Sequence, residues 1–271
     1  ADSLVQTMLR AVEREDNPLV ATSLVGYATS VLPYASDRGV GECKLLDLSR
    51  HHSLRGVRTS SLRYLSTSAQ SEAVLDSMFV EWQQGDNPLL TVNDWMRATY
   101  HLAQYLPSKR QEILSRQRAR LATDDARAEF DFVSRGCDTT PSVQDSLFAS
   151  LLQVENRRVE PWAAQLLSLL NDPISEPHNN RFLLPALDAL EEVQRTSAIF
   201  FPGDWLAALL SHHRSEEARA LVSDWITRHP DYPAPLMNKV KQNAYRWGGS
   251  EASARTSQCV LCEDWGVIKK T

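Results

Sequence analysis

Apolar residues recur along most of this chain at the 3.6-residue spacing of an amphipathic α-helix. Four stripes follow this spacing: Leu4, Val5, Met8, Leu9 and Val12; Val20, Leu24, Tyr27 and Val31; Val74, Leu75, Met78, Phe79 and Trp82; and Ala218, Leu221, Val222, Trp225 and Ile226. Strict alternation of apolar and polar residues is hard to find, and Val/Ile/Thr-rich runs bounded by turns are missing. The pattern therefore predicts helices and no β-strands.

Capping residues divide these stripes into short helices, which we expect to number about a dozen, with about 10–15 residues each. The candidate helix starts are Asn17-Pro18, Asn87-Pro88, Thr91-x-x-Asp94, Ser142-x-x-Asp145 and Ser215-Glu216-Glu217. The segment Pro33–Lys44 contains Gly39 and Gly41 and is predicted to be a loop. With 10 glycines among 271 residues, the composition also favours helix, because glycine destabilises a helix interior.

Short amphipathic helices joined by tight loops pack as antiparallel hairpins. Stacked in sequence, such hairpins form an α-solenoid of the HEAT or armadillo type. A clean repeat consensus is missing, so the predicted fold is all-α, an irregular α-solenoid of antiparallel helix hairpins.

Four segments carry the most distinctive sequence of the chain. They are Ala128-Glu-Phe-Asp-Phe-Val-Ser134, Glu155-Asn-Arg-Arg-Val-Glu-Pro-Trp162, Ile199-Phe-Phe-Pro-Gly-Asp-Trp-Leu206 and His229-Pro-Asp-Tyr-Pro-Ala-Pro-Leu236. In order and spacing they resemble the C-terminal helical domain of M1-family zinc aminopeptidases, in the bacterial, aminopeptidase N-like version. The resemblance covers residues 1–246 as one domain and leaves residues 247–271 as a tail of uncertain origin.

The resemblance implies a non-catalytic domain that covers the active-site cleft of a larger enzyme and helps to restrict and bind peptide substrates. Its partners would be the catalytic domain of the same parent chain and the peptides themselves. The zinc would lie in that catalytic domain, because neither the His-Glu-x-x-His helix nor the Gly-x-Met-Glu-Asn loop of the family occurs here. No cofactor is expected in this chain, and no catalytic residue is assigned.

Composition and periodicity fit a second class of protein equally well, a stand-alone α-solenoid that binds a partner protein in its groove. The net charge of −5 argues against nucleic acid as a partner, since no basic surface is expected to release counterions. No apolar run reaches the roughly 20 residues that span a bilayer. The four scattered cysteines favour a reducing compartment, so we expect a cytoplasmic protein, with any targeting signal upstream of Ala1.

The basic segment Lys109–Arg127 is the candidate for substrate contact. Arg116 and Arg120 are the chosen residues, because guanidinium groups on a concave face could hold the C-terminal carboxylate of a peptide. A solvated helix face with i,i+4 ion pairs is the alternative for the same segment.

Metal-ligating residues give only weak signals. No two of the seven histidines have the i,i+4 spacing of a zinc-binding helix. The Cys259-x-x-Cys262 pair in the tail is half of a zinc ribbon or an isolated redox pair, and an accidental pair is the simpler interpretation. No metal site is predicted.

Overall fold

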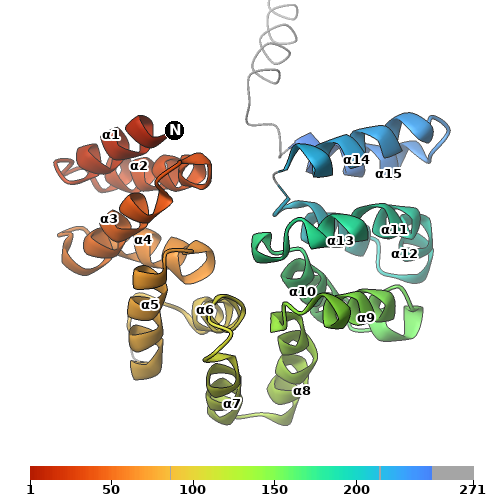
Figure 1. Cartoon of the computed structure of the whole chain (residues 1–271), viewed down its shortest axis with the longest axis horizontal. Helices are drawn as coiled ribbons and strands as arrows, with labels where there is room; N and C mark the ends of the chain where they lie inside the picture. The colour runs from red at the N-terminus through yellow and green to blue at the C-terminus, as the bar shows by residue number, and fades with distance from the viewer. Residues whose placement is uncertain (86, 214, 246–271) are drawn as a thin grey trace, which may run out of the picture. The chain divides into compact units, whose positions relative to one another are not determined.

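A computed structural model describes residues 1–85, 87–213 and 215–245 of the chain, and in these residues every regular element is helical (Figure 1). The all-α prediction is confirmed. The chain divides into two compact units, Ala1–Phe130 and Asp131–Thr271, and the boundary falls inside α8 (Asp124–Val133). The predicted division at residue 246 and the tail with Cys259 and Cys262 lie outside the described residues.

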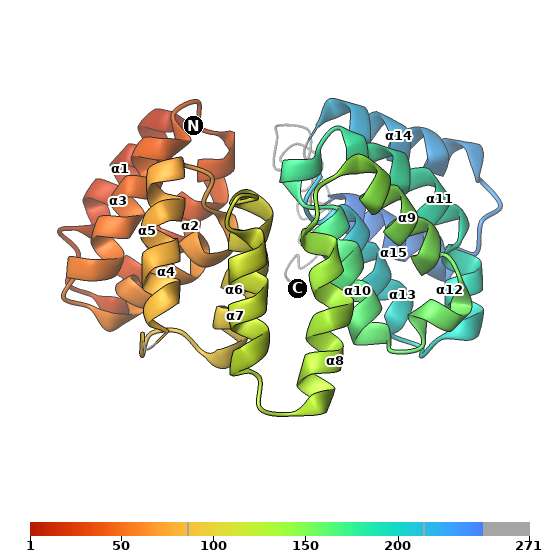
Figure 2. The ribbon, with the colours of Figure 1, turned by 60° about the horizontal axis from the view of Figure 1, so that its bottom comes forward.

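Unit 1 is built from consecutive helices that pack on one another. Its elements are α1 (Asp2–Val12), α2 (Pro18–Val31), η1 (Leu32–Tyr34), α3 (Arg38–His51), α4 (Arg55–Ser68), α5 (Glu72–Gln84), α6 (Val92–Tyr105) and α7 (Arg110–Arg120). α1 packs on α2, and α3 packs on α4. The next contacts link alternate helices: α1 packs on α3 and α3 on α5, while α2 packs on α4 and α4 on α6 (Figure 2).

The predicted stripes of unit 1 fall on α1, α2 and α5. In α1, Val5, Leu9 and Val12 are buried, whereas Leu4 is 49% exposed. In α5 the whole predicted stripe is buried, from Val74 to Trp82. α2 is different, because it buries Ala21, Val25 and Ala28, while Tyr27 is 64% exposed. The predicted stripe of α2 is therefore wrong. This helix has no charged residue, so its apolar period alone does not distinguish the buried face from the exposed one.

The predicted loop over residues 33–44 is also wrong, because α3 begins at Arg38. Asp37 caps this helix by accepting a hydrogen bond from Val40 N at 3.3 Å. Gly41 is buried against the preceding segment, and a Cβ atom there would lie 2.5 Å from Leu32 Cδ1. The glycine thus serves close helix packing rather than a turn.

Two of the predicted helix starts in unit 1 are confirmed, and one is not. Asn17 caps α2 through its side chain, and Thr91 forms a capping box with Asp94 at the start of α6. Asn87 begins no helix, since its Oδ1 accepts from Leu89 N at 2.9 Å and closes a short turn. The capping box four residues later sets the start of α6 instead.

Unit 2 contains the second set of helices. They are η2 (Ser134–Cys137), α9 (Pro141–Leu151), η3 (Val154–Arg157), α10 (Glu160–Leu170), η4 (Pro173–Ser175), η5 (His178–Phe182), α11 (Leu183–Asp188), α12 (Leu190–Thr196), α13 (Phe201–Leu210), α14 (Glu216–Arg228) and α15 (Ala234–Tyr245). α13 is central, because it packs on α10, α11, α12 and α15. Its Trp205 and Leu206 are fully buried in the core of this unit.

The helix starts of unit 2 are also partly as predicted. Ser215 caps α14 by accepting from Ala218 N at 3.2 Å. Ser142 is not a cap, because α9 begins one residue earlier, after Thr140, without a side-chain capping bond. Asp145, the other half of that predicted box, instead contacts His178 at 3.0 Å and Arg181 at 3.2 Å.

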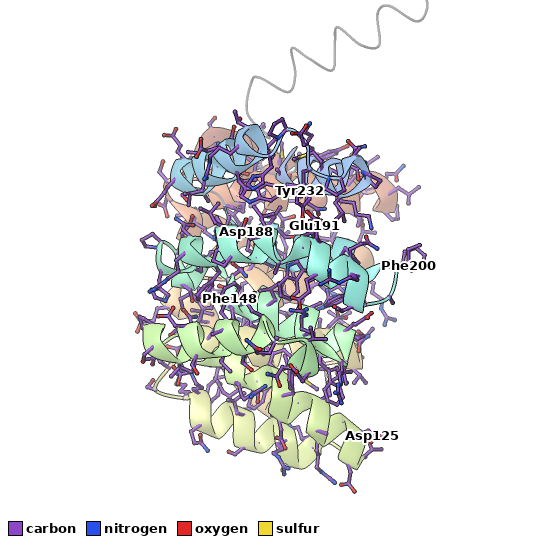
Figure 3. All side chains as sticks on the ribbon, turned by 90° about the vertical axis from the view of Figure 1, so that its right-hand side faces the viewer. Asp125, Phe148, Asp188, Glu191, Phe200 and Tyr232 are labelled. Carbon is purple, nitrogen blue, oxygen red and sulfur yellow. The ribbon has the colours of Figure 1, made fainter. Side chains whose placement is uncertain are left out.

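One loop of unit 2 exposes large apolar side chains. Ile199 is 70% exposed and Phe200 is 80% exposed, and Phe200 projects from the ribbon in Figure 3. The loop is held by Glu160, whose Oε1 accepts from Ala198 N at 2.7 Å.

Across the described residues, none of the helices combines the length and apolar character that a membrane crossing requires.

Candidate functional site

The predicted substrate-binding arginines lie on α7, where they contact the carboxyl end of α5. Arg116 Nη2 donates to Gln83 O at 2.8 Å, and Arg120 Nη2 donates to Trp82 O at 3.3 Å and to Gln83 O at 3.1 Å. The Arg120 guanidinium also lies over the Trp82 ring, 4.7 Å from its centroid. Burial, followed by the positive charge of Arg116, lowers the pKa of Arg120.

These contacts give the two arginines a structural task. The last carbonyls of a helix lack intrahelical donors and carry partial negative charge, so cationic donors stabilise them. The structure therefore brings Arg116 and Arg120 together at a helix end. Their contact with a substrate stays a prediction. A substrate would have to bind the guanidinium N–H groups that do not donate to the carbonyls of α5.

Gly85 ends α5 beside these arginines in the left-handed conformation, with φ of 73°. A Cβ atom at this position would lie 3.1 Å from Arg120 Nη2. We expect Gly85→Ala to lower the free energy of unfolding by roughly 1–2 kcal/mol, because an L side chain is disfavoured at positive φ. Urea denaturation would measure the change.

Gly26→Ala is the matched control for this substitution. Gly26 lies inside α2, and a Cβ atom there would meet nothing within 4 Å. This variant should be more stable by roughly 0.5–1 kcal/mol, the usual gain of alanine over glycine in a helix. Equal effects at the two positions would show that the conformation of Gly85 does not matter.

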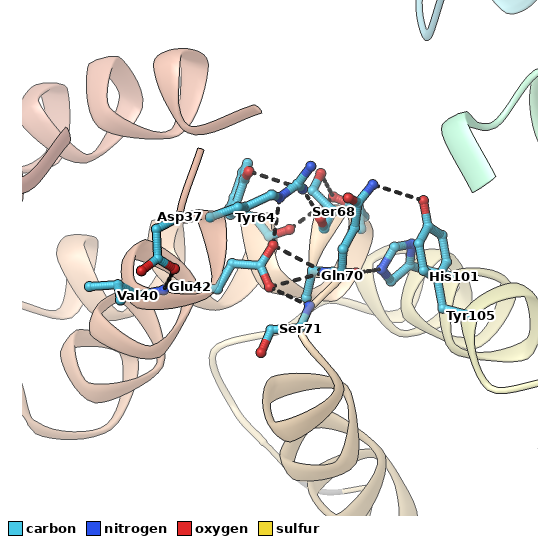
Figure 4. A network of polar contacts seen from close by, with 12 residues as sticks. Asp37, Val40, Glu42, Tyr64, Ser68, Gln70, Ser71, His101 and Tyr105 are labelled. Carbon is cyan, nitrogen blue, oxygen red and sulfur yellow. Dashed lines mark hydrogen bonds and ion pairs between the residues drawn. The ribbon is translucent and has the colours of Figure 1, made fainter. Parts of the chain in front are cut away.

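A buried carboxylate organises the other end of α5 (Figure 4). Glu42 on α3 is fully buried and accepts hydrogen bonds from Gln70 N at 3.0 Å and Ser71 N at 2.8 Å, just before α5 begins. Its other bond is from Arg38 Nε at 2.6 Å. Arg38 in turn donates to Ser68 O at the end of α4, so one ion pair holds the junction of three helices.

The same junction is held from the side of α6. His101 Nε2 contacts Ala69 O at 2.7 Å, and Gln70 Nε2 donates to Tyr105 Oη at 3.2 Å. The α4–α5 connection is thus fixed by polar side chains from α3 and α6 (Figure 4). α5 has an anionic side chain at its amino end and two cationic side chains at its carboxyl end, which is the arrangement that its dipole favours.

Most histidines of the described chain hold backbone or side-chain oxygens. Besides His101, His52 contacts Val12 O at 3.1 Å, and His229 contacts Trp225 O at 2.7 Å. The described residues include no group of three or more His, Cys, Asp or Glu side chains arranged to hold a metal ion.

His213 is a buried histidine of unit 2, only 2% exposed. Its Nε2 lies 2.8 Å from Asn171 Oδ1 and its Nδ1 lies 3.1 Å from Asn180 Oδ1. Burial lowers the pKa of His213 from 6.5 to about 4; Glu176 opposes this change and His212 adds to it. The ring is therefore neutral at pH 7, and it donates at only one of the two contacts.

The four segments that carry the family resemblance contribute mainly aromatic side chains that pack inside the fold. Phe130 stacks on Tyr100 with centroids 5.7 Å apart, and the Trp205 indole donates to Ala186 O at 3.1 Å. In the last segment, Tyr232 packs edge-on to Trp225 at 5.0 Å.

Trp225 and Tyr232 also face the acidic side of α11 and α12. Trp225 Nε1 donates to Asp188 Oδ1 at 2.7 Å. Burial, then the charges of Glu191 and Asp188, raise the pKa of Tyr232 to about 12 (Figure 3). The most distinctive sequence of the chain thus forms packing and hydrogen bonds within the fold.

Unit 1 carries an open groove that could hold a ligand. It has a volume of about 750 Å³ and lies where α3, α4, α5 and the turn before α6 meet. Its lining includes Ser49, Arg50, Arg58, Val80, Glu81 and Leu89. This volume lies within the range of ligand-binding pockets, and the lining mixes apolar and charged groups.

The arginines of the groove differ in how they are held. Arg58 Nη1 donates to His52 O at 2.7 Å and to Ser53 O at 3.2 Å, after α3 ends. The Arg50 side chain makes no hydrogen bond or ion pair with any described residue. The sequence analysis missed both, because each is an isolated arginine and only the packing of α3 against α4 places them in one groove.

In comparisons with protein-family models, with curated proteins and with solved structures, nothing matches this chain. The resemblance to M1-family aminopeptidases therefore depends on the quoted sequence segments.

Proposed function

We propose that this chain is a non-catalytic, peptide-binding helical domain that serves as the C-terminal domain of an M1-family zinc aminopeptidase. One observation supports it: the segments that resemble the family make core contacts, as the Phe130–Tyr100 and Trp225–Tyr232 pairs do, so the likeness concerns a fold and not a reaction. Zinc, and the groups that activate water on it, would belong to the catalytic domain of the parent enzyme.

The helix contacts of unit 1 support the finer proposal of a HEAT-like solenoid. Pairs α1/α2 and α3/α4 each pack together, and each pair contacts the next. Such stacked hairpins offer an extended surface for a peptide or for another domain. Its proposed partners are the catalytic domain and peptide substrates, in the cytoplasm, with no nucleic acid or membrane.

Deletion of these residues from the parent enzyme tests the proposal. Contacts far from the scissile bond support turnover of long substrates, so cleavage of peptides several residues long should fall more than cleavage of a single aminoacyl-anilide. Equal losses on both substrates would point to a purely structural role. Unchanged kinetics would contradict a role in covering the cleft.

The stand-alone interaction module remains the second candidate, and the coding sequence upstream of Ala1 distinguishes the two. An in-frame His-Glu-x-x-His motif upstream would support the aminopeptidase proposal. It should lie within about a few hundred residues, the length of one or two domains. A different upstream domain would contradict it and favour the module.

A further inference from the structure

The groove of unit 1 has donors that the fold itself does not use. Arg58 is fixed through Nη1 on the carbonyls of His52 and Ser53, while its Nε and Nη2 make no hydrogen bond within the described residues. A guanidinium held in this way loses little side-chain entropy when it binds a further acceptor. Arg50, which lines the same groove, has its whole guanidinium open among the described residues.

The charge balance of the groove favours a ligand with a single negative charge. Glu81 is the one acidic residue in the described lining, against two arginines. It is directed to the turn before α6, because it accepts a hydrogen bond from the Asn87 amide. Among the described lining residues, positive side chains thus outnumber negative ones by one, an excess that a carboxylate neutralises and a phosphate dianion exceeds.

Beside the polar residues Ser77, Gln84 and Asn87, part of the groove wall is apolar. Val80 is 54% exposed on α5, and Pro88 and Leu89 follow it on the turn. Arg55 Nη2 donates to Pro88 O at 3.2 Å, so the turn is tied to α4. An apolar side chain next to the bound carboxylate would cover this wall.

We propose that this groove binds an acidic peptide, with a carboxylate on Arg50 and Arg58 and a neighbouring apolar side chain on Val80 and Leu89. This inference rests on the proposed function, from which it takes the class of ligand, a peptide. Its residues differ from Arg116 and Arg120, so it assigns a second and separate contact for peptides.

The test is a titration of the full chain with a blocked tripeptide, acetyl-Leu-Glu-Leu-amide, followed by amide chemical shifts in NMR. We expect saturable shifts at Val80 and Leu89, and binding at least about tenfold weaker for the peptide with Gln in place of Glu, because a charge-assisted pair is lost. Added salt should weaken only the Glu peptide.

Arg50→Gln is the decisive variant, because Arg50 supports no described contact and its loss should leave the fold intact. It should weaken binding of the Glu peptide about tenfold. Arg97→Gln, an exposed arginine of α6 outside the groove, is the matched control and should change nothing.

Three results would overturn the proposal: no saturable binding, equal binding of the Gln peptide, or full binding by Arg50→Gln. Binding of inorganic phosphate as tight as that of the peptide would overturn the assignment of a carboxylate. These failures would leave the proposed enzyme domain standing, since the deletion experiment on the parent enzyme tests it separately.

Discussion

Glu42→Ala should lower the free energy of unfolding by about 3–5 kcal/mol, the usual cost of breaking a buried ion pair. The substitution removes the acceptor for Gln70 N and Ser71 N and leaves Arg38 without its carboxylate. Unpaired donors in a protein interior are costly, because they have lost water without gaining a partner. Urea denaturation, followed by circular dichroism, would measure the loss.

Glu13→Gln provides the matched control for this prediction. Glu13 pairs with Lys44, but the two side chains are 38% and 30% exposed. Solvent screens such a pair, so its removal should cost no more than about 1 kcal/mol. A similar loss for both variants would show that burial of the Glu42 carboxylate contributes nothing special.

Stability should also fall as the pH decreases from about 6.5 to about 4, through His213. Its pKa is lowered to about 4 in the folded protein against 6.5 ordinarily, so the unfolded chain binds the proton first. Protonation of the unfolded state then favours unfolding, and stability falls with falling pH between these values. The full difference corresponds to about 3 kcal/mol.

Thermal or urea unfolding at several pH values would measure this dependence. In His213→Gln the slope between pH 6.5 and pH 4 should decrease, whereas His51→Gln, at an exposed position, should keep it. A stability that rises toward acid pH would contradict the prediction. It would mean that the ring is protonated in the folded state and donates to both Asn171 and Asn180.

Sequence patterns predicted the helices well where polarity differs between the faces of a helix. The α5 stripe and the caps Asn17, Thr91 and Ser215 are correct, because each depends on residues within a few positions of one another. The exposed Tyr27 of α2 was predicted to be buried because that helix has no charged residue to mark its exposed face.

Errors and omissions arise where distant residues decide the structure. Gly41 belongs to a helix because Leu32 packs against it, and no local signal reports that contact. Glu42, like Arg50 and Arg58, looks like an ordinary surface residue in the sequence. Only the packing of three helices buries the first and gathers the other two into a groove.

The capping of α5 has a consequence for the order in which this chain can become structured during synthesis. The carboxylate that stabilises its amino end is on α3 and leaves the ribosome earlier, whereas Arg116 and Arg120 leave it later. Until α7 is made, the last carbonyls of α5 have only water as a partner. The end of α5 should therefore stay frayed on the nascent chain, and become protected from hydrogen exchange only when the last helices of unit 1 arrive.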